Sequence, residues 1–361
     1  MIRYLDEFRD QERVKRLVDE IIEIQFPEKV NIMEVCGTHT MSIRRFGIHK
    51  LVESKVNLIS GPGCPVCVTP VSYMDMAIWL SQRDDVIITT FGDMVKVPGT
   101  RGSLQDLGRD VRVVYSPIES IGIAEQNPYK KVVFLAVGFE TTVPTIAATV
   151  AEAKKRGLDN FFILEGNKIM PPPLRILLDD RDMHIDGFLL PGHVCTVSGY
   201  VQYGFIASEY GKTAVVSGFE PVDILLAISE ILRLIKKREP SVKNMYPRAV
   251  RPEGNRKAME LVYDVFETTD AEWRGLGTIS GSGLVLREPY REFSAERHFE
   301  IPDFDSHEHP LCICGEVLKG KAVPEECELF ARGCTPDHPL GPCMVSSEGT
   351  CAAHYRYRNP S

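Results

Sequence analysis

Seven short aliphatic runs, each followed by a loop rich in glycine, proline or polar residues, constrain the fold of this chain most strongly. The runs lie at 31–35, 56–60, 86–90, 132–137, 161–164, 185–190 and 213–217, and amphipathic stretches of helical length follow them. Strands that alternate with helices are typical of parallel sheets, because two parallel strands need a long crossover between them. From about Val30 to Val222 the sequence therefore predicts an α/β fold with a mostly parallel sheet.

Two of the loops look like copies of one another. Gly138-Phe139-Glu140 and Gly218-Phe219-Glu220 each follow a strand and precede an apolar helix, at an offset of 80 residues. Such a repeat predicts two related α/β domains, at 30–122 and 123–240, joined near residues 116–129, although a triplet this short also recurs by chance.

The two ends of the chain have a different character. Isoleucine and leucine recur at helical spacing through 223–237, and a further helix is expected at 255–266. Beyond Thr268 the periodicity is lost, so residues 241–361 are expected to form a C-terminal domain that is partly helical and partly irregular. We expect the N-terminal helix, within residues 1–29, to pack on that domain, because the cysteine-rich segment at 311–361 is too short to build a core alone.

Charge and hydropathy limit the cellular compartment and the classes of partner that can be expected for this chain. The chain has 42 basic and 50 acidic side chains, a net charge of -8, and no basic block suited to nucleic acid. Its N-terminus is charged and lacks the apolar region of a secretory signal, and its apolar runs have strand length. We therefore expect a cytoplasmic protein with no membrane partner. Because cytosolic thiols are kept reduced, its ten cysteines are expected to be metal ligands or redox thiols.

The loops after the strands carry most of the residues with useful chemistry. In an open parallel sheet these loops emerge at one edge, where ligands bind, so we expect their side chains to converge. The residues concerned are Cys36, His39, Cys64, Cys67, Asp93, Glu140, His193 and Cys195. Asp93 and Glu140 are candidate acid/base groups, although a carboxylate in the first turn of a helix is a common alternative, and His193 is equally ambiguous.

Two cysteine motifs stand out among these loops. In CGTHT, Cys36 lies at an expected helix start near His39, where the helix N-terminus and an imidazolium would lower the pKa of the thiol. A buried, inert cysteine is the alternative. In GPGCPVC, Cys64 and Cys67 are two residues apart in a turn that Pro65 stiffens, which suits a redox disulfide or half of a metal site better than two core cysteines.

The C-terminal segment contains cysteines 312, 314, 327, 334, 343 and 351. Four thiolates complete either a structural zinc site or a [4Fe–4S] cluster, so the number alone does not identify the metal. Zinc ribbons place ligands in pairs two to four residues apart, whereas these cysteines are widely spaced with prolines between them. The spacing favours a cluster, and the two additional cysteines suggest an adjacent redox pair.

Six motifs occur in the order CGTHT, GPGCPVC, FGDMVKVPG, GFETT, PGHVC and CMVSSEGTCAA. Together they closely resemble the HypD family of [NiFe]-hydrogenase maturation factors, from Cys36 to Tyr357. The resemblance implies a scaffold on which the Fe(CN)2CO group of the hydrogenase is assembled. It also implies a small HypC-type chaperone as partner and a HypE-type protein as cyanide donor.

The resemblance also implies a role for each cysteine in these motifs. Cys36 would bind the iron that carries cyanide and carbon monoxide, with His39 and Glu140 in support and the redox pair Cys64 and Cys67 beside it. A [4Fe–4S] cluster would be held by Cys312, Cys327, Cys334 and Cys351, and Cys314 and Cys343 would form a second thiol pair, similar to ferredoxin:thioredoxin reductase. Electrons would then pass from the cluster through both pairs to Cys36.

Two other functions fit the same residues. A [4Fe–4S]-dependent thiol–disulfide oxidoreductase would use the cluster and the CPVC motif without needing iron at Cys36. A zinc-stabilised binding protein would need no redox thiols. A maturation scaffold with redox activity agrees best with all six motifs.

Overall fold

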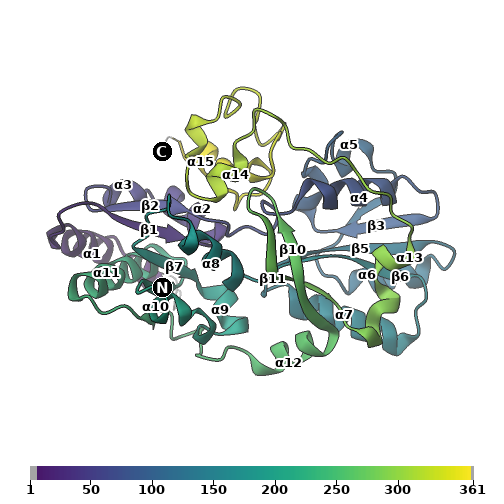
Figure 1. Cartoon of the computed structure of the whole chain (residues 1–361), viewed down its shortest axis with the longest axis horizontal. Coiled ribbons are helices and arrows are strands. Elements are labelled where there is room, and N and C mark those ends of the chain that lie inside the picture. The colour runs from purple at the N-terminus through teal and green to yellow at the C-terminus, as the bar shows by residue number, and fades with distance from the viewer. Residues whose placement is uncertain (1–5, 359–361) are drawn as a thin grey trace.

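The computed structural model describes residues 6–358, and within them two parallel sheets are covered by helices on both faces (Figure 1). The first sheet has the order β2-β1-β7-β8-β9, with β1 (Val30–Glu34), β2 (Val56–Ser60), β7 (Gly187–Pro191), β8 (Thr213–Ser217) and β9 (Val242–Asn244). The second has the order β4-β3-β5-β6, with β3 (Val86–Thr90), β4 (Val111–Val113), β5 (Lys131–Gly138) and β6 (Phe161–Asn167). The predicted α/β class with two parallel-sheet domains is confirmed.

All seven predicted strands are present. Six of the aliphatic runs are largely buried between layers of helices, whereas β2 is an edge strand in which only Val56 is fully buried. The two strands without such a run, β4 and β9, are three residues long and lie at sheet edges. Their side chains are only partly buried, so they lack the apolar signal of the others.

The strands are grouped differently from the predicted ranges. Strand β1 pairs with β2 and also with β7, where Ile32 lies opposite Gly187, while β3 pairs with β5. Each sheet thus takes strands from both 30–122 and 123–240. The predicted join at 116–129 lies inside the second sheet, between β4 and β5, because strand partners depend on tertiary packing that the pattern of runs does not encode.

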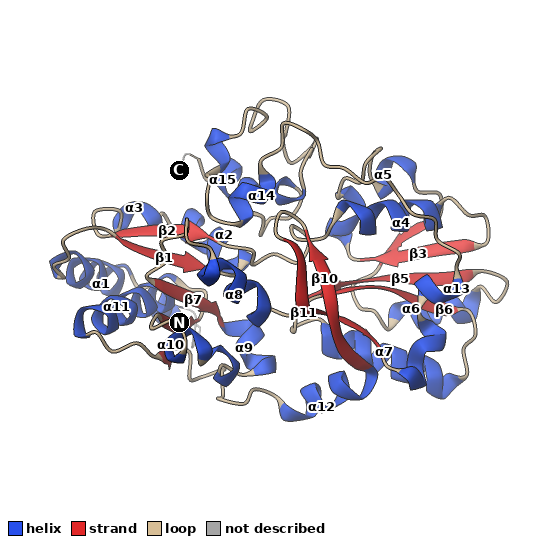
Figure 2. Cartoon of the chain, in the orientation of Figure 1, coloured by secondary structure: helices blue, strands red, loops and turns tan. Residues whose placement is uncertain are grey.

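Helices cover both faces of each sheet, as Figure 2 shows. They are α1 (Gln11–Glu23), α2 (Gly37–Arg45), α3 (Ile48–Leu51), α4 (Val71–Ser81), α5 (Leu104–Leu107), α6 (Glu119–Gln126), α7 (Val143–Arg156), α8 (Pro171–Asp179), α9 (Gly192–Ser198), α10 (Phe205–Ser208), α11 (Pro221–Lys237), α12 (Arg256–Val265), α13 (Ala295–His298), α14 (Cys314–Leu318) and α15 (Thr350–Arg356). The helices predicted at 223–237 and 255–266 are α11 and α12. None of the described helices has both the length and the apolar character that crossing a membrane requires.

The N-terminal helix packs elsewhere than the sequence predicts. Helix α1 begins after Asp10, whose carboxylate accepts a hydrogen bond from the backbone N–H of Arg13. Its buried Leu17, Val18 and Ile21 join a core with α11 and the first sheet. The expected packing on the cysteine-rich domain is therefore wrong, because the apolar face of α11 already provides a core for this helix.

Residues beyond Thr268, predicted to be irregular, begin with an antiparallel hairpin of β10 (Phe266–Trp273) and β11 (Gly277–Leu286). The hairpin stands between the two sheets (Figure 1). Trp273 and Ile279 enter one core with the first sheet, whereas Leu284 and Leu286 enter another with the second. Its glycine-rich second strand and a register shift between Thr269 and Ala271 hide the alternation that would have predicted it.

The cysteine-rich segment lies above the hairpin and both sheets, as the yellow end of the ribbon in Figure 1 shows. It is mostly loop, as predicted, with α14 and α15 as its helices and a small core around Phe330 and Met344. Two of its cysteines, Cys314 and Cys343, are instead buried in the core beneath the first sheet's loops. The segment is thereby fixed to the edge where the strand-to-helix loops meet.

Candidate functional site

Cys36 lies where β1 ends and α2 begins, and only 2% of it is exposed. Its sulfur lies 3.9 Å from both ring nitrogens of His193, which is the second residue of α9 and follows β7. Because β1 and β7 are neighbours in the sheet, their loops bring these two side chains together. The predicted convergence is therefore confirmed for Cys36 and His193.

The environment of the Cys36 thiol differs from the predicted one. Burial, together with the nearby carboxylate of Glu348, raises the pKa of this thiol far above its ordinary value. Burial also lowers the pKa of His39 to about 3 and the pKa of His193 to about 4, so both imidazoles are neutral. The expected low thiol pKa is wrong, because no imidazolium is present and desolvation outweighs the helix N-terminus.

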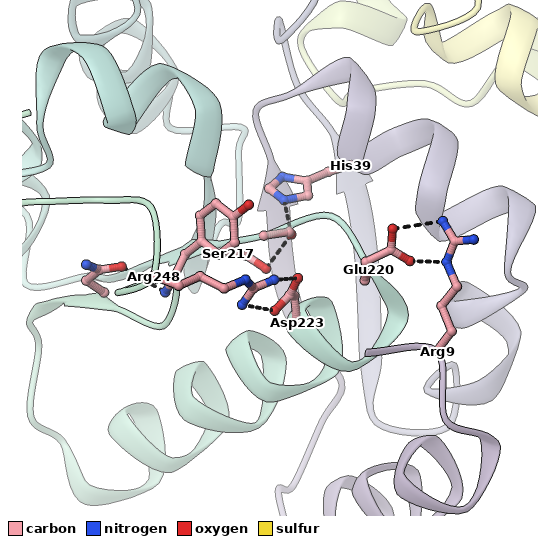
Figure 3. A network of polar contacts seen from close by, with 9 residues as sticks. Arg9, His39, Ser217, Glu220, Asp223 and Arg248 are labelled. Carbon is pink, nitrogen blue, oxygen red and sulfur yellow. Dashed lines mark hydrogen bonds and ion pairs between the residues drawn. The ribbon is translucent and has the colours of Figure 1, made fainter. Parts of the chain in front are cut away.

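His39 supports the site from behind. Its Nε2 donates a hydrogen bond of 2.9 Å to the carbonyl of Gly218, in the loop after β8 (Figure 3). The rings of His39 and His193 lie 4.8 and 5.0 Å from the ring of Phe219, which both imidazoles contact. The Nδ1 of His39 is buried without a hydrogen-bond partner. His39 therefore ties α2 to the loop that also supports His193.

A buried ion pair holds this loop in place. The carboxylate of Asp223, 1% exposed at its side chain, accepts two hydrogen bonds from Arg248, at 2.8 and 2.5 Å (Figure 3). A Cβ on Gly218 would come within 2.3 Å of the Asp223 carboxylate, so only glycine fits there. Nearby, Glu220 pairs with Arg9 in the same network.

The CPVC loop lies directly against Cys36. A Cβ on Gly63 would stand 2.1 Å from the backbone nitrogen of Cys36, and the carbonyl of Gly63 accepts a hydrogen bond of 3.1 Å from Gly37. Cys64 follows at once, and its sulfur accepts a hydrogen bond of 3.3 Å from the backbone N–H of Cys67. Both thiols are buried. The structure thus brings the three loop cysteines into one neighbourhood, as predicted.

Cys67 faces the C-terminal segment. Its sulfur lies 3.9 Å from the carbonyl oxygen of Pro342, and its thiol interacts with that of Cys343. The sulfur of Cys343 lies 2.6 Å from that of Cys314. A chain of thiol contacts therefore runs from Cys314 through Cys343 to Cys67, and so toward Cys36.

The six cysteines of the C-terminal segment line a single pocket. Cys312, Cys327, Cys334 and Cys351 line it together with Cys314, Cys343 and apolar side chains such as Leu329 and Phe330. Four thiolates are the donor set of a [4Fe–4S] cluster, so this pocket has the thiols for a cluster and two more. Among the residues that the structure describes, no three histidine, cysteine or acidic side chains converge to hold a single metal ion.

Glu140 reaches the site from the second sheet, at the end of β5. One carboxylate oxygen accepts a hydrogen bond of 3.0 Å from the backbone N–H of Met170, and the other is buried without a partner. Burial raises the pKa of Glu140 to about 7. Its charge influences the pKa of Cys195 and of Tyr203, both buried near Cys36. Asp93, by contrast, is exposed on η2 (Gly92–Lys96).

Two carboxylates beside Cys36 were not predicted. Glu34 accepts a hydrogen bond of 3.2 Å from the backbone N–H of Cys36, and burial raises its pKa to about 8. Glu348 accepts one of 2.6 Å from the hydroxyl of Thr38. A lone glutamate inside the apolar run NIMEV was a usable signal for Glu34. No local signal existed for Glu348, which reaches α2 from the end of the chain.

Comparison with known proteins agrees with these features. Residues 12–358 match the sequence model of HypD, which is described as the hydrogenase formation hypA family. Hydrogenase maturation factor HypD2 of Bradyrhizobium diazoefficiens is 43% identical, with 99% of this chain and 97% of the relative covered. Hydrogenase maturation factor HypD of Rhodobacter capsulatus and that of Escherichia coli K12 are each 43% identical, with 99% of this chain and 98% of each relative covered.

Proposed function

Because the chain belongs to the HypD family of hydrogenase maturation factors, we propose that it is the scaffold on which the Fe(CN)2CO group of [NiFe] hydrogenase is assembled. The observation that carries this proposal is the place of Cys36. Its thiol lies against His193 and against the backbone of a loop that bears two more thiols. The soft sulfur of Cys36, next to the redox-capable pair Cys64 and Cys67, suits an iron ion that is bound transiently while it receives its ligands.

Iron is the cargo in this proposal, and Cys36 is its ligand on this chain. Thiolate is a soft donor, which suits low-valent iron carrying cyanide and carbon monoxide. Because burial raises the pKa of the Cys36 thiol, its proton must leave when the metal binds. One ligand from this chain leaves positions for the diatomic ligands, and for a cysteine of a HypC-type chaperone. A HypE-type protein would deliver the cyanide.

Cys312, Cys327, Cys334 and Cys351 would hold a [4Fe–4S] cluster. The pocket that these four line together with Cys314 and Cys343 supports a cluster at this place. When bound, such a cluster supplies electrons one at a time. The zinc-stabilised alternative uses the same ligands and predicts zinc without acid-labile sulfide. Metal and sulfide analysis of the anaerobically purified protein separates the two.

The two thiol pairs would exchange a disulfide. The thiolate of Cys343 attacks the sulfur of Cys67 in a Cys64–Cys67 disulfide and releases Cys64 as the thiolate, which takes a proton. The thiolate of Cys314 then attacks Cys343 in the mixed disulfide and releases Cys67. Two electrons and two protons move from one pair to the other, with no other reactant. The contacts of Cys343 with both Cys314 and Cys67 support this order.

Infrared spectroscopy of the complex with its small chaperone tests the proposal. Protein carrying iron with cyanide and carbon monoxide should show the stretching bands of both ligands, and Cys36→Ala should abolish them. Cys195→Ala is the matched control, since Cys195 is equally buried nearby but is not proposed as a ligand. Bands that persist in Cys36→Ala would overturn the assignment of the iron ligand.

The proposed cluster has a test of its own. Cys327→Ala should lower the iron and sulfide content of the anaerobically purified protein and remove its broad visible absorption. An unchanged iron and sulfide content would contradict the assignment.

The path from Cys314 to Cys67 also favours a second function, that of a [4Fe–4S]-dependent thiol–disulfide oxidoreductase. This function predicts turnover of a disulfide substrate with an electron donor in the Cys36→Ala variant. The scaffold proposal predicts that the Cys36→Ala variant carries no cyanide-ligated iron, even if it turns over a disulfide substrate.

A further inference from the structure

A second hollow, of about 550 Å³, opens on the surface beside the cysteine-lined pocket, and Cys312 lines both. Its walls come from three loops, at residues 96–106, 307–312 and 337–342, and Arg274 of the hairpin turn lies among them. The first of these loops contains the motif FGDMVKVPGT, which the proposed function does not use. We propose that this hollow binds a small anion, through a carboxylate or phosphate group held by Arg274.

The guanidinium of Arg274 is built into the floor of the hollow. Its side chain is only 2% exposed. The backbone N–H of Arg274 donates to the carbonyl of Val68 at 3.0 Å, and a terminal nitrogen donates to the carbonyl of Pro98 at 3.2 Å. The second contact anchors one end of the guanidinium. Its Nε is buried and has no hydrogen-bond partner.

A buried cationic donor without an acceptor is rare in folded proteins, because it has lost water and gained nothing in exchange. The nearest carboxylate is that of Glu308, with an oxygen 3.8 Å from the Nε, too long for a hydrogen bond. Glu308 is partly exposed at the side of the hollow. It therefore acts as a weak internal counterion, in the position that the carboxylate or phosphate of a ligand would take.

The distribution of charge agrees with an anion at the floor. Lys96 provides a second cation in the wall, next to the carbonyl-lined turn at Pro98. The other acidic residues, Asp106 and Asp337, are exposed at the rim, where water screens them. One oxygen of Asp106 already accepts hydrogen bonds from the backbone and hydroxyl of Ser103. An entering anion thus meets its strongest partner, the desolvated Arg274, at depth.

Isothermal titration of the full-length, anaerobically purified protein tests this site. Inorganic phosphate and acetate are the probes, titrated separately at constant ionic strength. Saturable binding of one equivalent of either probe is expected, and the tighter probe identifies the group that the site prefers. Arg274→Gln should weaken binding at least tenfold. Glu308→Gln should tighten it severalfold, because the competing carboxylate is gone.

Weaker binding by Arg274→Gln and tighter binding by Glu308→Gln are expected only if Arg274 binds the ligand. An arginine with a purely structural role would not produce both effects. If Arg274→Gln does not fold, two other variants still test the site. Glu308→Gln should bind the probe more tightly than the parent protein, and Lys96→Met should bind it more weakly. Glu288→Gln is the matched control, since it removes one negative charge from an exposed ion pair with Arg291 and should leave the affinity unchanged. Binding of neither probe, or a Glu308→Gln variant that binds no tighter, would overturn the proposal.

Discussion

Gly63 and Cys36 touch backbone to backbone, so closely that a methyl group on Gly63 would stand 2.1 Å from the nitrogen of Cys36 and 2.4 Å from its Cα. The loop that carries Cys64 and Cys67 is therefore held at the proposed iron ligand by the main chain itself. A side chain at position 63 has no room, because both neighbours are backbone atoms that cannot rotate away.

Replacing Gly63 by alanine tests this contact. Gly63→Ala should lower the free energy of unfolding by about 3 kcal/mol, since overpacking against fixed atoms forces the backbone to shift. Thermal unfolding measures the loss. Gly122→Ala is the control, because a Cβ there meets nothing within 4 Å in α6. That variant should gain about 0.5 to 1 kcal/mol from higher helix propensity. Similar stability of both variants would contradict the close contact.

The ion pair beneath the Gly218 loop should matter more than a surface pair. Arg248→Met leaves the buried carboxylate of Asp223 without its partner and should cost about 3 kcal/mol. Arg109→Met breaks an ion pair whose side chains are 60% and 93% exposed, and should cost less than about 1 kcal/mol. Chemical denaturation of both variants gives the comparison. A loss for Arg248→Met as small as that for Arg109→Met would mean that water reaches Asp223.

The proposed disulfide exchange predicts a trapped intermediate. In a Cys64→Ser, Cys314→Ser double variant, Cys343 and Cys67 each lose the partner that would resolve a mixed disulfide. Mild oxidation should then link Cys67 to Cys343, which peptide mass spectrometry detects. The single variants are the controls, because each retains one resolving thiol and should accumulate much less of this link. A link from Cys343 to Cys36 instead would place the relay elsewhere.

Glu165 makes stability depend on pH. Burial raises the pKa of Glu165 from 4.5 to about 7, so the folded protein holds this proton more tightly than the unfolded chain. The stability that this bound proton contributes to the folded protein is fully present below pH 4.5 and is lost as the pH rises through about 7. Glu165→Gln, which stays neutral, should therefore be more stable than the parent protein by about 2 kcal/mol at pH 8.

The difference between these two proteins should shrink toward pH 5, and their melting temperatures at pH 5 and pH 8 check this. Glu260→Gln, on the exposed face of α12, should shift neither value. An equal gain for Glu165→Gln at both pH values would show that packing, not ionisation, is the cause.

The sequence predicts the strands of this fold well and their partners poorly. A run such as VIITT is buried on both faces, so its composition alone identifies a strand. The pairing of β1 with β7 brings Ile32 to Gly187 across 155 residues, and no local pattern encodes it. The β10–β11 hairpin was not predicted for another reason. Its side chains enter two different cores, so its sequence lacks the regular alternation of apolar and polar residues that marks a strand with one face in solvent.

The same division holds for the candidate site. The motifs identify Cys36, Cys64 and Cys67, because thiols in glycine-rich loops after strands have few other uses. They do not predict that the Cys36 thiol is desolvated, since its burial comes from His193 and from the C-terminal segment. Glu348 approaches from more than 300 residues away, with its carbonyl 2.4 Å from the position of a Cβ on Gly37. Only the folded chain brings it there.

The interleaving of the two sheets also sets an order of events during synthesis. Strands β3 to β6 leave the ribosome before β7 and β8, so the second sheet can close while β1, paired with β2, still lacks its other neighbour, β7. Cys36 meets His193 only after α9 has emerged, and Glu348 only after residue 348 has been added. The site proposed for iron is thus completed long after Cys36 itself has been made, and a chain truncated before residue 348 would carry this thiol less covered.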